Sequence, residues 1–364
     1  MENLRIPGPT PLPDEILKVL SRQMINHRGE EFIRMMADIT TNLKKLFQTK
    51  NDILLLTGSG TGGLEAVIVN TLSPGDKLLV ISNGIFGERF AGIAQQFGAE
   101  VIPLRFEWGK AVDADVVRQA LHAEPKIKAV SVTHNETSTG VTNDLASISS
   151  VVKEFDKLLL VDAISSLGAI NLPVDEWHCD VAVTASQKGW MVPPGLAMVS
   201  VSQQAWQAHS KAKMPRFYWD FTQAKNFLEK GQTPWTPAIS MVFALEVSLE
   251  MMLQEGLSNI IARHARVSKA TRDGIKSLGL SLFADENYAS NTVTAVAASD
   301  GLDVAKMLKI LREEHDMVLA GGLRELAGKI FRIGHLGWVN EDDIERVISA
   351  LKAALPKAGF RNAS

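Results

Sequence analysis

Apolar positions between residues 51 and 201 form short, nearly continuous runs, and longer segments with one apolar face separate these runs. The runs predict strands at 51–57, 77–81, 100–104, 127–133, 157–161, 181–185 and 196–201. The segments between them predict helices at 62–72, 88–97, 112–122 and 145–155. Strands that are apolar on both faces and alternate with helices are typical of a parallel sheet covered on both sides. The pattern therefore predicts an α/β fold.

The pattern changes towards both ends of the chain. Residues 6–13 (IPGPTPLP) are too rich in Pro and Gly for a helix or a central strand, and they predict either an ordered arm or a loose end. Helices are expected from Pro13 onwards and at 30–47, and a helical pair at 238–278. A smaller set follows, with strands at 291–298 and 330–333 and helices at 303–314 and 341–355. We predict an N-terminal arm (1–15), a large domain (16–252) and a small C-terminal domain (253–364).

Composition narrows the class of protein. Of the 364 residues 46% are apolar and 22% charged, with a formal net charge of −3, which is typical of a globular protein without a nucleic-acid surface. The N-terminus lacks a signal-peptide pattern, and no run reaches the roughly 18 apolar residues of a membrane span. The lone Cys179 excludes an internal disulfide, and the eight histidines show no metal-ligand spacing. We expect a cytoplasmic protein that binds no metal, nucleic acid or membrane.

The first candidate for chemistry is the segment Gly58-Ser59-Gly60-Thr61-Gly62-Gly63, between a predicted strand and a helix. Small residues let backbone N–H groups approach an anion, and a helix N-terminus adds positive charge, so the segment predicts a phosphate site. Its letters also match the dinucleotide pattern G-x-G-x-x-G. That pattern needs an acidic residue after the next strand, and Ile81-Ser82-Asn83-Gly84 has none. A tight turn without a ligand is the remaining alternative.

Three charged residues lie on or just beyond other predicted strands. Asp162 is either a turn or helix-cap residue or the partner of a cationic ring nitrogen. Lys188 follows 181–185 in a loop rich in Gly and Pro, where it is either a solvated surface group or an amine that forms an imine with an aldehyde cofactor. Arg332 is either part of a structural ion pair or a clamp on a substrate carboxylate. Ligands bind beyond the carboxyl ends of parallel strands, which favours the functional interpretation of Asp162 and Lys188.

Six segments then occur in a familiar order: GSGTGG, NGIFGER, THNETSTG, VDAISSLGA, TASQKGWMVPPG and FRIGHLG. In this order they resemble the class V aminotransferases of the fold type I pyridoxal-phosphate superfamily, and the branch most alike is that of alanine–glyoxylate and serine–pyruvate (or serine–glyoxylate) aminotransferases. The resemblance implies a large domain with a mainly parallel seven-stranded sheet between helices and a smaller C-terminal α/β domain. It also implies pyridoxal 5′-phosphate as cofactor and a homodimer with active sites at the interface.

The resemblance assigns roles to matching positions. Lys188 is similar to the lysine that holds the cofactor as a Schiff base, and Asp162 to the aspartate that pairs with the pyridine nitrogen. Arg332 resembles the arginine that binds the substrate α-carboxylate, and Gly8 lies in an N-terminal segment near the substrate entrance. The other cofactor contacts that it implies are Ser59, Gly60, Thr61, Phe86, Thr137, Gln187, Gln232 and Thr233.

Two of these assignments depart from the family or rest on a looser match. Phe86 takes the position that stacks on the cofactor ring, where many relatives have tryptophan, so an aromatic face is kept and an indole N–H is lost. Gln232 and Thr233 resemble the segment that reaches the phosphate of the neighbouring subunit. The sequence GQTPWTP contains a second candidate, Thr236.

The activity implied by the resemblance is transfer of an amino group from alanine or serine to glyoxylate or pyruvate in ping-pong order, with Lys188 as general base and then acid. No second arginine is evident for a dicarboxylate side chain, which disfavours aspartate and glutamate. A transaminase for 2-aminoethylphosphonate would share the same framework. A cysteine desulfurase would need a nucleophilic thiol in the C-terminal region, whereas Cys179 precedes a large-domain strand and is interpreted as a buried structural residue.

Overall fold

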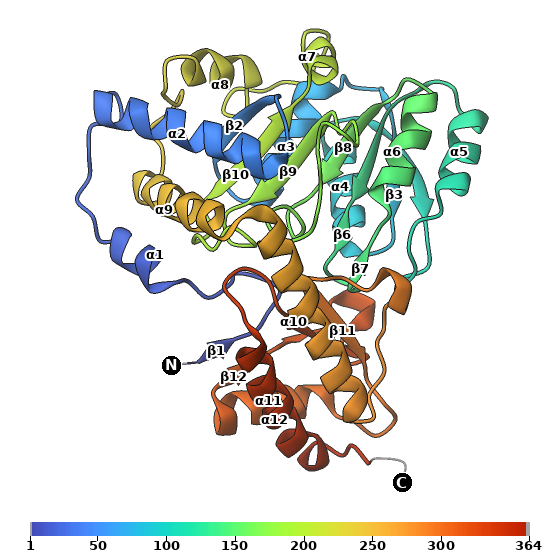
Figure 1. The fold of residues 1–364 in the computed structure, drawn as a ribbon. Helices are drawn as coiled ribbons and strands as arrows, with labels where there is room; N and C mark the ends of the chain where they lie inside the picture. Colours follow the sequence, from blue (N-terminus) through green and yellow to red (C-terminus); the bar gives the residue numbers. More distant parts are fainter. Residues whose placement is uncertain (1, 362–364) are drawn as a thin grey trace.

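The structure is a computed structural model that describes residues 2–361. A large body surrounds a central sheet, and a smaller body formed by the C-terminal third lies beneath it in Figure 1. The first strand of the chain, β1, lies beside this smaller body. The sheet has seven strands in the order β2-β10-β9-β8-β5-β3-β4. Their bounds are Asp52–Thr57 (β2), Leu196–Val201 (β10), Val181–Ala185 (β9), Leu158–Asp162 (β8), Ile127–Thr133 (β5), Lys77–Ser82 (β3) and Glu100–Arg105 (β4).

The sheet is mainly parallel, as expected. β10 is antiparallel to both of its neighbours, β2 and β9, and the pairs from β9 to β4 are parallel. Helices are interleaved with these strands or flank them: Asp14–Val19 (α1), Glu30–Phe47 (α2), Gly60–Thr71 (α3), Ile85–Gln96 (α4), Ala114–Ala123 (α5), Leu145–Glu154 (α6), Gln203–His209 (α7), Phe221–Leu228 (α8) and Ile239–Glu255 (α9).

Alternation along each strand explains why the apolar runs are continuous. Ile53 and Leu55 of β2 join a core with α2, α5, α6 and α9, whereas Leu54 and Leu56 join a second core with α3, α4, α7 and α8. Successive side chains of a strand point to opposite faces, so a strand buried on both sides must be apolar at every position. The expected α/β architecture is confirmed.

The C-terminal third forms its own core around a three-stranded antiparallel sheet in the order β11-β14-β13. Its elements are Leu257–Ser277 (α10), Glu286–Tyr288 (η1), Val293–Ala297 (β11), Val304–His315 (α11), Met317–Val318 (β12), Ala320–Gly321 (β13), Arg324–Leu326 (η2), Ile330–Gly334 (β14) and Glu341–Lys357 (α12). Gly256 separates α9 from α10 close to the predicted boundary. The division at 252/253 itself stays a prediction.

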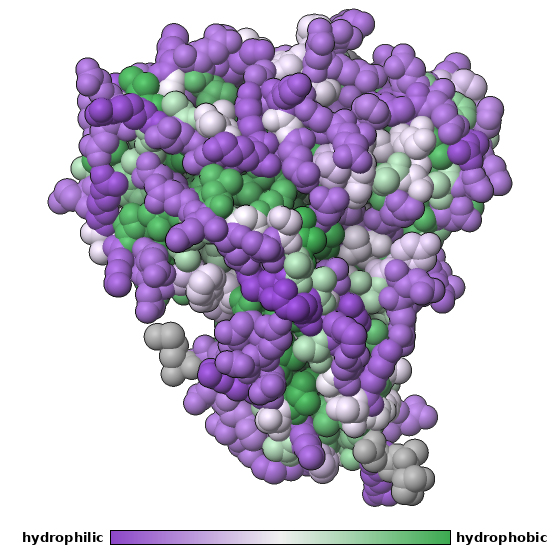
Figure 2. Space-filling view, in the orientation of Figure 1, coloured by the Kyte–Doolittle hydropathy of each residue, from purple (hydrophilic) through white to green (hydrophobic). Residues whose placement is uncertain are grey.

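The N-terminal segment is an ordered arm. Strand β1 (Asn3–Leu4) pairs in parallel with β12, and the arm then runs past the carboxyl end of the central sheet to α1. Figure 2 shows that the face in view is largely hydrophilic, with apolar side chains gathered around α2 and α9. Within residues 2–361, no helix combines the length and apolar character needed to cross a membrane. The expected cytoplasmic location stays a prediction.

Two helices begin earlier than the sequence predicted, and both begin at the candidate site. The helix predicted at 62–72 starts at Gly60, and the helix predicted at 88–97 starts at Ile85. Glycine has a low helix propensity, so Gly60 and Gly87 concealed these first turns. The remaining two-residue strands, Asn135–Glu136 (β6) and Val141–Thr142 (β7), form a small hairpin beside the site.

Candidate active site

A pocket lies beyond the carboxyl ends of β2, β5, β8 and β9, as expected for an open parallel sheet. It brings together most of the predicted cofactor contacts from distant parts of the chain. Its lining residues are Ser59, Gly60, Thr61, Leu64, Phe86, Arg89, Thr133, Asn135, Thr137, Asp162, Ile164, Ser165, Gln187 and Lys188.

The glycine-rich segment supplies one end of the pocket and the first turn of α3. Ser59 is the N-cap of α3, and its hydroxyl accepts a hydrogen bond from the Gly62 backbone N–H at 3.3 Å. The glycines at 58 and 62 are needed because a Cβ at either position would lie within 3 Å of the Trp219 indole. A Cβ at Gly60 would meet Ile164 at 2.6 Å. Close packing thus accounts for the glycines, while Ser59, Gly60 and Thr61 face the pocket.

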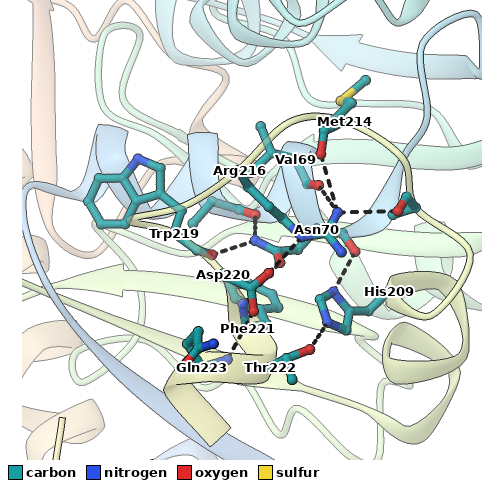
Figure 3. Close-up of polar contacts among 12 residues, drawn as sticks. Val69, Asn70, His209, Met214, Arg216, Trp219, Asp220, Phe221, Thr222 and Gln223 are labelled. Atoms are coloured by element: carbon teal, nitrogen blue, oxygen red, sulfur yellow. Dashed lines mark hydrogen bonds and ion pairs between the residues drawn. The ribbon is translucent and has the colours of Figure 1, made fainter. Parts of the chain in front are cut away.

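A polar network holds Trp219 against this segment (Figure 3). The Asn70 side chain, on α3, donates to the Trp219 carbonyl oxygen at 2.6 Å and accepts from the Phe221 N–H at 3.0 Å. Arg216 donates to the Val69 carbonyl oxygen at 3.0 Å. The Trp219 indole N–H donates to Glu65, also on α3, at 3.0 Å. Residues 216–221 therefore support the helix whose N-terminus faces the pocket.

Lys188 lies three residues beyond the end of β9 and lines the pocket. Burial lowers the pKa of its amine to about 8, although the charge of Asp162 opposes the shift. Its Nζ donates to the carbonyl oxygen of Pro7 in the N-terminal arm. Gly8 is next to it, and a Cβ at Gly8 would overlap the lysine side chain. The structure thus places Gly8 beside the lysine.

Asp162 is the last residue of β8 and is 3% exposed. Burial raises the pKa of its carboxyl to about 7, and the backbone N–H of Ile164, which donates to Oδ1 at 3.0 Å, opposes the shift. An ionised carboxylate in this position would be stabilised by a cationic partner in the pocket.

The residues present fit pyridoxal phosphate. Gln187 Oε1 and Thr133 Oγ1 are buried atoms of lining residues without a hydrogen-bond partner in the described chain, which leaves them free for a polar ligand. The α3 N-terminus suits a phosphate, Asp162 a protonated ring nitrogen, and the Lys188 amine an aldehyde. The Thr137 hydroxyl donates to Ser165 Oγ at 2.8 Å on the same wall. Phe86 supplies an aromatic face.

Arg332 lies on β14 of the small domain, behind Thr137, and is 6% exposed. Its guanidinium donates to the Gly321 carbonyl oxygen at 2.9 and 3.0 Å and to the Thr137 carbonyl oxygen at 3.2 Å. Among residues 2–361 no carboxylate forms an ion pair with it. The charge of Glu136 acts on this guanidinium without forming an ion pair with it, and a substrate carboxylate would supply a direct partner for the buried cation.

Gln232 and Thr233 do not line this pocket. Both are held by Arg28, whose guanidinium donates to Gln232 Oε1 at 2.9 Å and to the Thr233 carbonyl oxygen at 2.8 Å. The Thr233 hydroxyl donates to the Trp235 carbonyl oxygen at 2.7 Å, whereas Thr236 is exposed. A contact with the neighbouring subunit's phosphate would not appear in one chain, so the assignment stays a prediction.

Several lining residues were not predicted. Arg89 projects from α4, where its guanidinium lies 4.7 Å from the centre of the Phe86 ring and donates to the Thr61 hydroxyl at 3.3 Å. Thr133 and Asn135 follow the same strand-end logic that singled out Asp162, and that signal could have identified them. Ser165 and Ile164 carry no such signal. Their place depends on the turn after β8.

Cys179 is remote from this chemistry. It precedes β9, whereas Lys188 follows the same strand, so the two lie towards opposite ends of the sheet. The cysteine is 1% exposed, and burial raises the pKa of its thiol to about 12. This environment suits a structural thiol rather than a nucleophile.

Comparison with known proteins agrees with this geometry. The family model for class V aminotransferases ("Aminotransferase class-V") matches residues 7–328. The chain is 47% identical to the soluble hydrogenase 42 kDa subunit of Anabaena cylindrica, over 99% of this chain and 94% of that protein. It is 39% identical to the L-aspartate–glyoxylate aminotransferase of Paracoccus denitrificans, over 91% of this chain and 85% of that protein.

Two further similarities extend over nearly the whole chain. The serine–glyoxylate aminotransferase of Methylorubrum extorquens is 35% identical, over 99% of this chain and 92% of that protein. The crystal structure of an alanine–glyoxylate aminotransferase from Nostoc superimposes with a TM-score of 0.94 at 31% identity, covering 97% of this chain and 95% of that one. With its lysine and its buried aspartate beyond and at the strand ends, this chain belongs to the class V aminotransferases, which use pyridoxal phosphate.

Proposed function

We propose that this aminotransferase moves the amino group of alanine or serine to glyoxylate or pyruvate. The observation that carries the proposal is the juxtaposition of partly buried Lys188 and buried Asp162 in one pocket, with Arg332, which forms no ion pair within residues 2–361, behind its wall. When bound, pyridoxal phosphate supplies an aldehyde that links to an amino group and a protonated ring that withdraws electrons from the adjacent carbon.

The chain's own residues supply binding and proton transfer. Lys188 has a pKa of about 8, so near neutral pH a fraction of its amine is unprotonated and can take a proton from the substrate α-carbon and return one. Asp162 stabilises a positive charge on the ring nitrogen. Arg332 would bind the substrate carboxylate, and the Pro7 carbonyl oxygen accepts a hydrogen bond from the lysine amine when that amine is free. These roles of the site residues are part of the proposal.

The substrates are supported by the small-amino-acid relatives and by the single buried guanidinium. Aspartate is a second donor to test, because the Paracoccus relative is named for it and Arg89 adds a guanidinium to the pocket. Arg89 already donates to Thr61 at the phosphate end, which favours a small donor side chain.

The Anabaena relative's name denotes a hydrogenase subunit. Iron–sulfur clusters are held by several cysteine thiolates. This chain has one cysteine, so its sequence does not offer the ligands for such a cluster.

The test is a half-reaction assay. Protein loaded with pyridoxal phosphate receives alanine, serine, aspartate or 2-aminoethylphosphonate without an acceptor, and its visible absorption band is followed. We expect alanine or serine to bleach the band fastest and glyoxylate or pyruvate to restore it. Bleaching by aspartate or 2-aminoethylphosphonate alone would refute the substrate proposal.

Lys188→Ala should lose turnover and keep its fold. Near-normal transamination by that variant would refute the central assignment.

We also propose a homodimer in which each subunit completes the other's site. Apolar side chains reach the surface around α2 and α9 (Figure 2), and Leu17 and Met24 are 50% and 52% exposed nearby in the chain. Exposed apolar patches of this kind mark association surfaces. The exposed hydroxyl of Thr236 is better placed than that of Thr233 to reach a second subunit.

A further inference from the structure

Two helices, α3 and α4, begin at the candidate site, and the first N–H groups of each have hydrogen-bond partners of a different kind. The end of α3 faces the pocket and is capped by its own Ser59. The N-cap position of α4 is Gly84, which has no side chain that could accept from the first N–H groups of that helix. The first N–H groups of any helix lack partners within the helix and need them from elsewhere.

For α4 these partners come from the β6 hairpin. The N–H of Ile85 donates to Ser138 Oγ at 3.0 Å, and the N–H groups of Phe86 and Gly87 donate to Glu136 Oε2 at 3.0 and 3.2 Å. The backbone N–H and hydroxyl of Ser138 donate to Glu136 Oε1 at 3.0 and 2.5 Å. The first turn of α4 is thus capped by a carboxylate located fifty residues away in the sequence.

The close approach of Glu136 to the start of α4 depends on the glycine at position 84. A Cβ at position 84 would overlap the Glu136 side chain and the Ser138 hydroxyl, so this close approach requires glycine. Glu136 is fully buried, and burial raises the pKa of its carboxyl while the four hydrogen bonds oppose that shift. All four of its partners are donors, so the arrangement suits an anion, which has only acceptors to offer.

We propose that Glu136 is a positioning residue for the cofactor ring. By capping α4 it holds Phe86, the second residue of that helix, against the pocket. Its negative charge also neutralises the N-terminus of α4, which leaves the N-terminus of α3 as the helix end that receives the phosphate. The inference rests on the proposed function, because it requires pyridoxal phosphate in this pocket.

The test measures cofactor affinity rather than turnover. Cofactor-free wild-type protein, Glu136→Gln and Ser59→Ala are titrated with pyridoxal phosphate and with pyridoxal, which lacks the phosphate. The amide of Glu136→Gln puts a donor against N–H donors, so both affinities should fall by about tenfold. Ser59→Ala should weaken pyridoxal phosphate alone. If wild-type protein binds no pyridoxal phosphate, the proposed function fails and the inference falls with it. Normal wild-type binding with unchanged affinities in Glu136→Gln would overturn the inference alone.

A double-mutant cycle tests whether Glu136 acts through Phe86. In a Phe86→Leu background, Glu136→Gln should cost less than about twofold in affinity, because the ring that it positions is already gone. Fully additive losses would overturn the proposal. Asp113→Ala removes the cap of α5, away from the pocket, and is the matched control: it should lower thermal stability and leave both affinities unchanged. If Glu136→Gln does not fold, Ser138→Ala replaces it in the same cycle, with an expected loss of about threefold.

Discussion

Arg332 is a buried guanidinium whose nitrogens donate to main-chain carbonyl oxygens and have no carboxylate partner within residues 2–361. We predict that Arg332→Gln lowers kcat/KM for amino donors by about a hundredfold, because charge-assisted hydrogen bonds to the substrate carboxylate are lost. Its affinity for pyridoxal phosphate should stay the same, since Arg332 does not line the pocket. Steady-state kinetics and a cofactor titration measure the two effects. Arg266→Gln, at an exposed ion pair, is the control. An equal loss of cofactor affinity would contradict this role.

Asp162 gives a prediction about pH. Its pKa rises from 3.8 to about 7 on folding, so the folded cofactor-free protein holds this proton more tightly than the unfolded chain. The resulting stability is present below about pH 4 and is lost as the pH rises through about 7. Asp162→Asn has no such loss. Its melting temperature relative to wild type should therefore increase over this interval and level off above pH 7.

Thermal melts of cofactor-free protein from about pH 5 to about pH 8.5 would show this trend. A pH-independent difference for Asp162→Asn would mean that the pKa of this carboxyl is not raised in the folded protein.

Among the elements, the N-terminal arm joins the two bodies of the protein. Arg5 forms an ion pair with Asp343 of α12 at 2.5 Å, and its carbonyl oxygen accepts from the Gly334 N–H at the end of β14 at 2.7 Å. Farther along, the Thr10 hydroxyl donates to the Lys188 carbonyl oxygen at 3.2 Å. The arm therefore connects the strand that carries Arg332 with the loop that carries Lys188.

We predict that Arg5→Ala lowers the stability of the protein by about 2 kcal/mol, because it leaves the partly buried Asp343 without its partner. It should also raise KM several-fold, since the end of β14 loses its tether. Chemical denaturation and kinetics measure these effects. Arg118→Ala, which breaks an exposed ion pair with Glu154, should have a much smaller effect on both. A KM unchanged in Arg5→Ala would show that the arm does not affect substrate binding.

The strands and most helices could be predicted because burial on both faces leaves a continuous apolar run. The starts of α3 and α4 could not, because Gly60, which allows close approach of Ile164, and Gly84, which allows that of Glu136, also disguise the beginning of a helix. At the site, Asp162 and Lys188 were accessible from their strand ends. Arg89 was not, because its role depends on the direction of a helical side chain. The external cap by Glu136 depends on a contact fifty residues distant, and no local pattern records it.

For the whole molecule, the proposed dimer predicts that two chains share each site. The protein should sediment as a dimer, and Thr236→Ala should weaken pyridoxal phosphate binding more than Thr233→Ala, whose hydroxyl is already bonded within its own loop. Analytical ultracentrifugation and cofactor titration test both parts. A monomer with full cofactor affinity would contradict the dimer, and a larger loss of affinity in Thr233→Ala than in Thr236→Ala would favour Thr233 as the contact.

The pairing of β1 with β12 has a consequence for how the chain is made. Residues 3 and 4 are translated long before their partners, Met317 and Val318. The arm must therefore wait without its partner strand until β12 has been translated, and contacts of such high sequence separation form late. The lysine loop, a short connection between adjacent strands β9 and β10, can close much earlier. We therefore expect the loop of Lys188 to form before the arm that meets its amine, so the site is completed only after β12 has been translated.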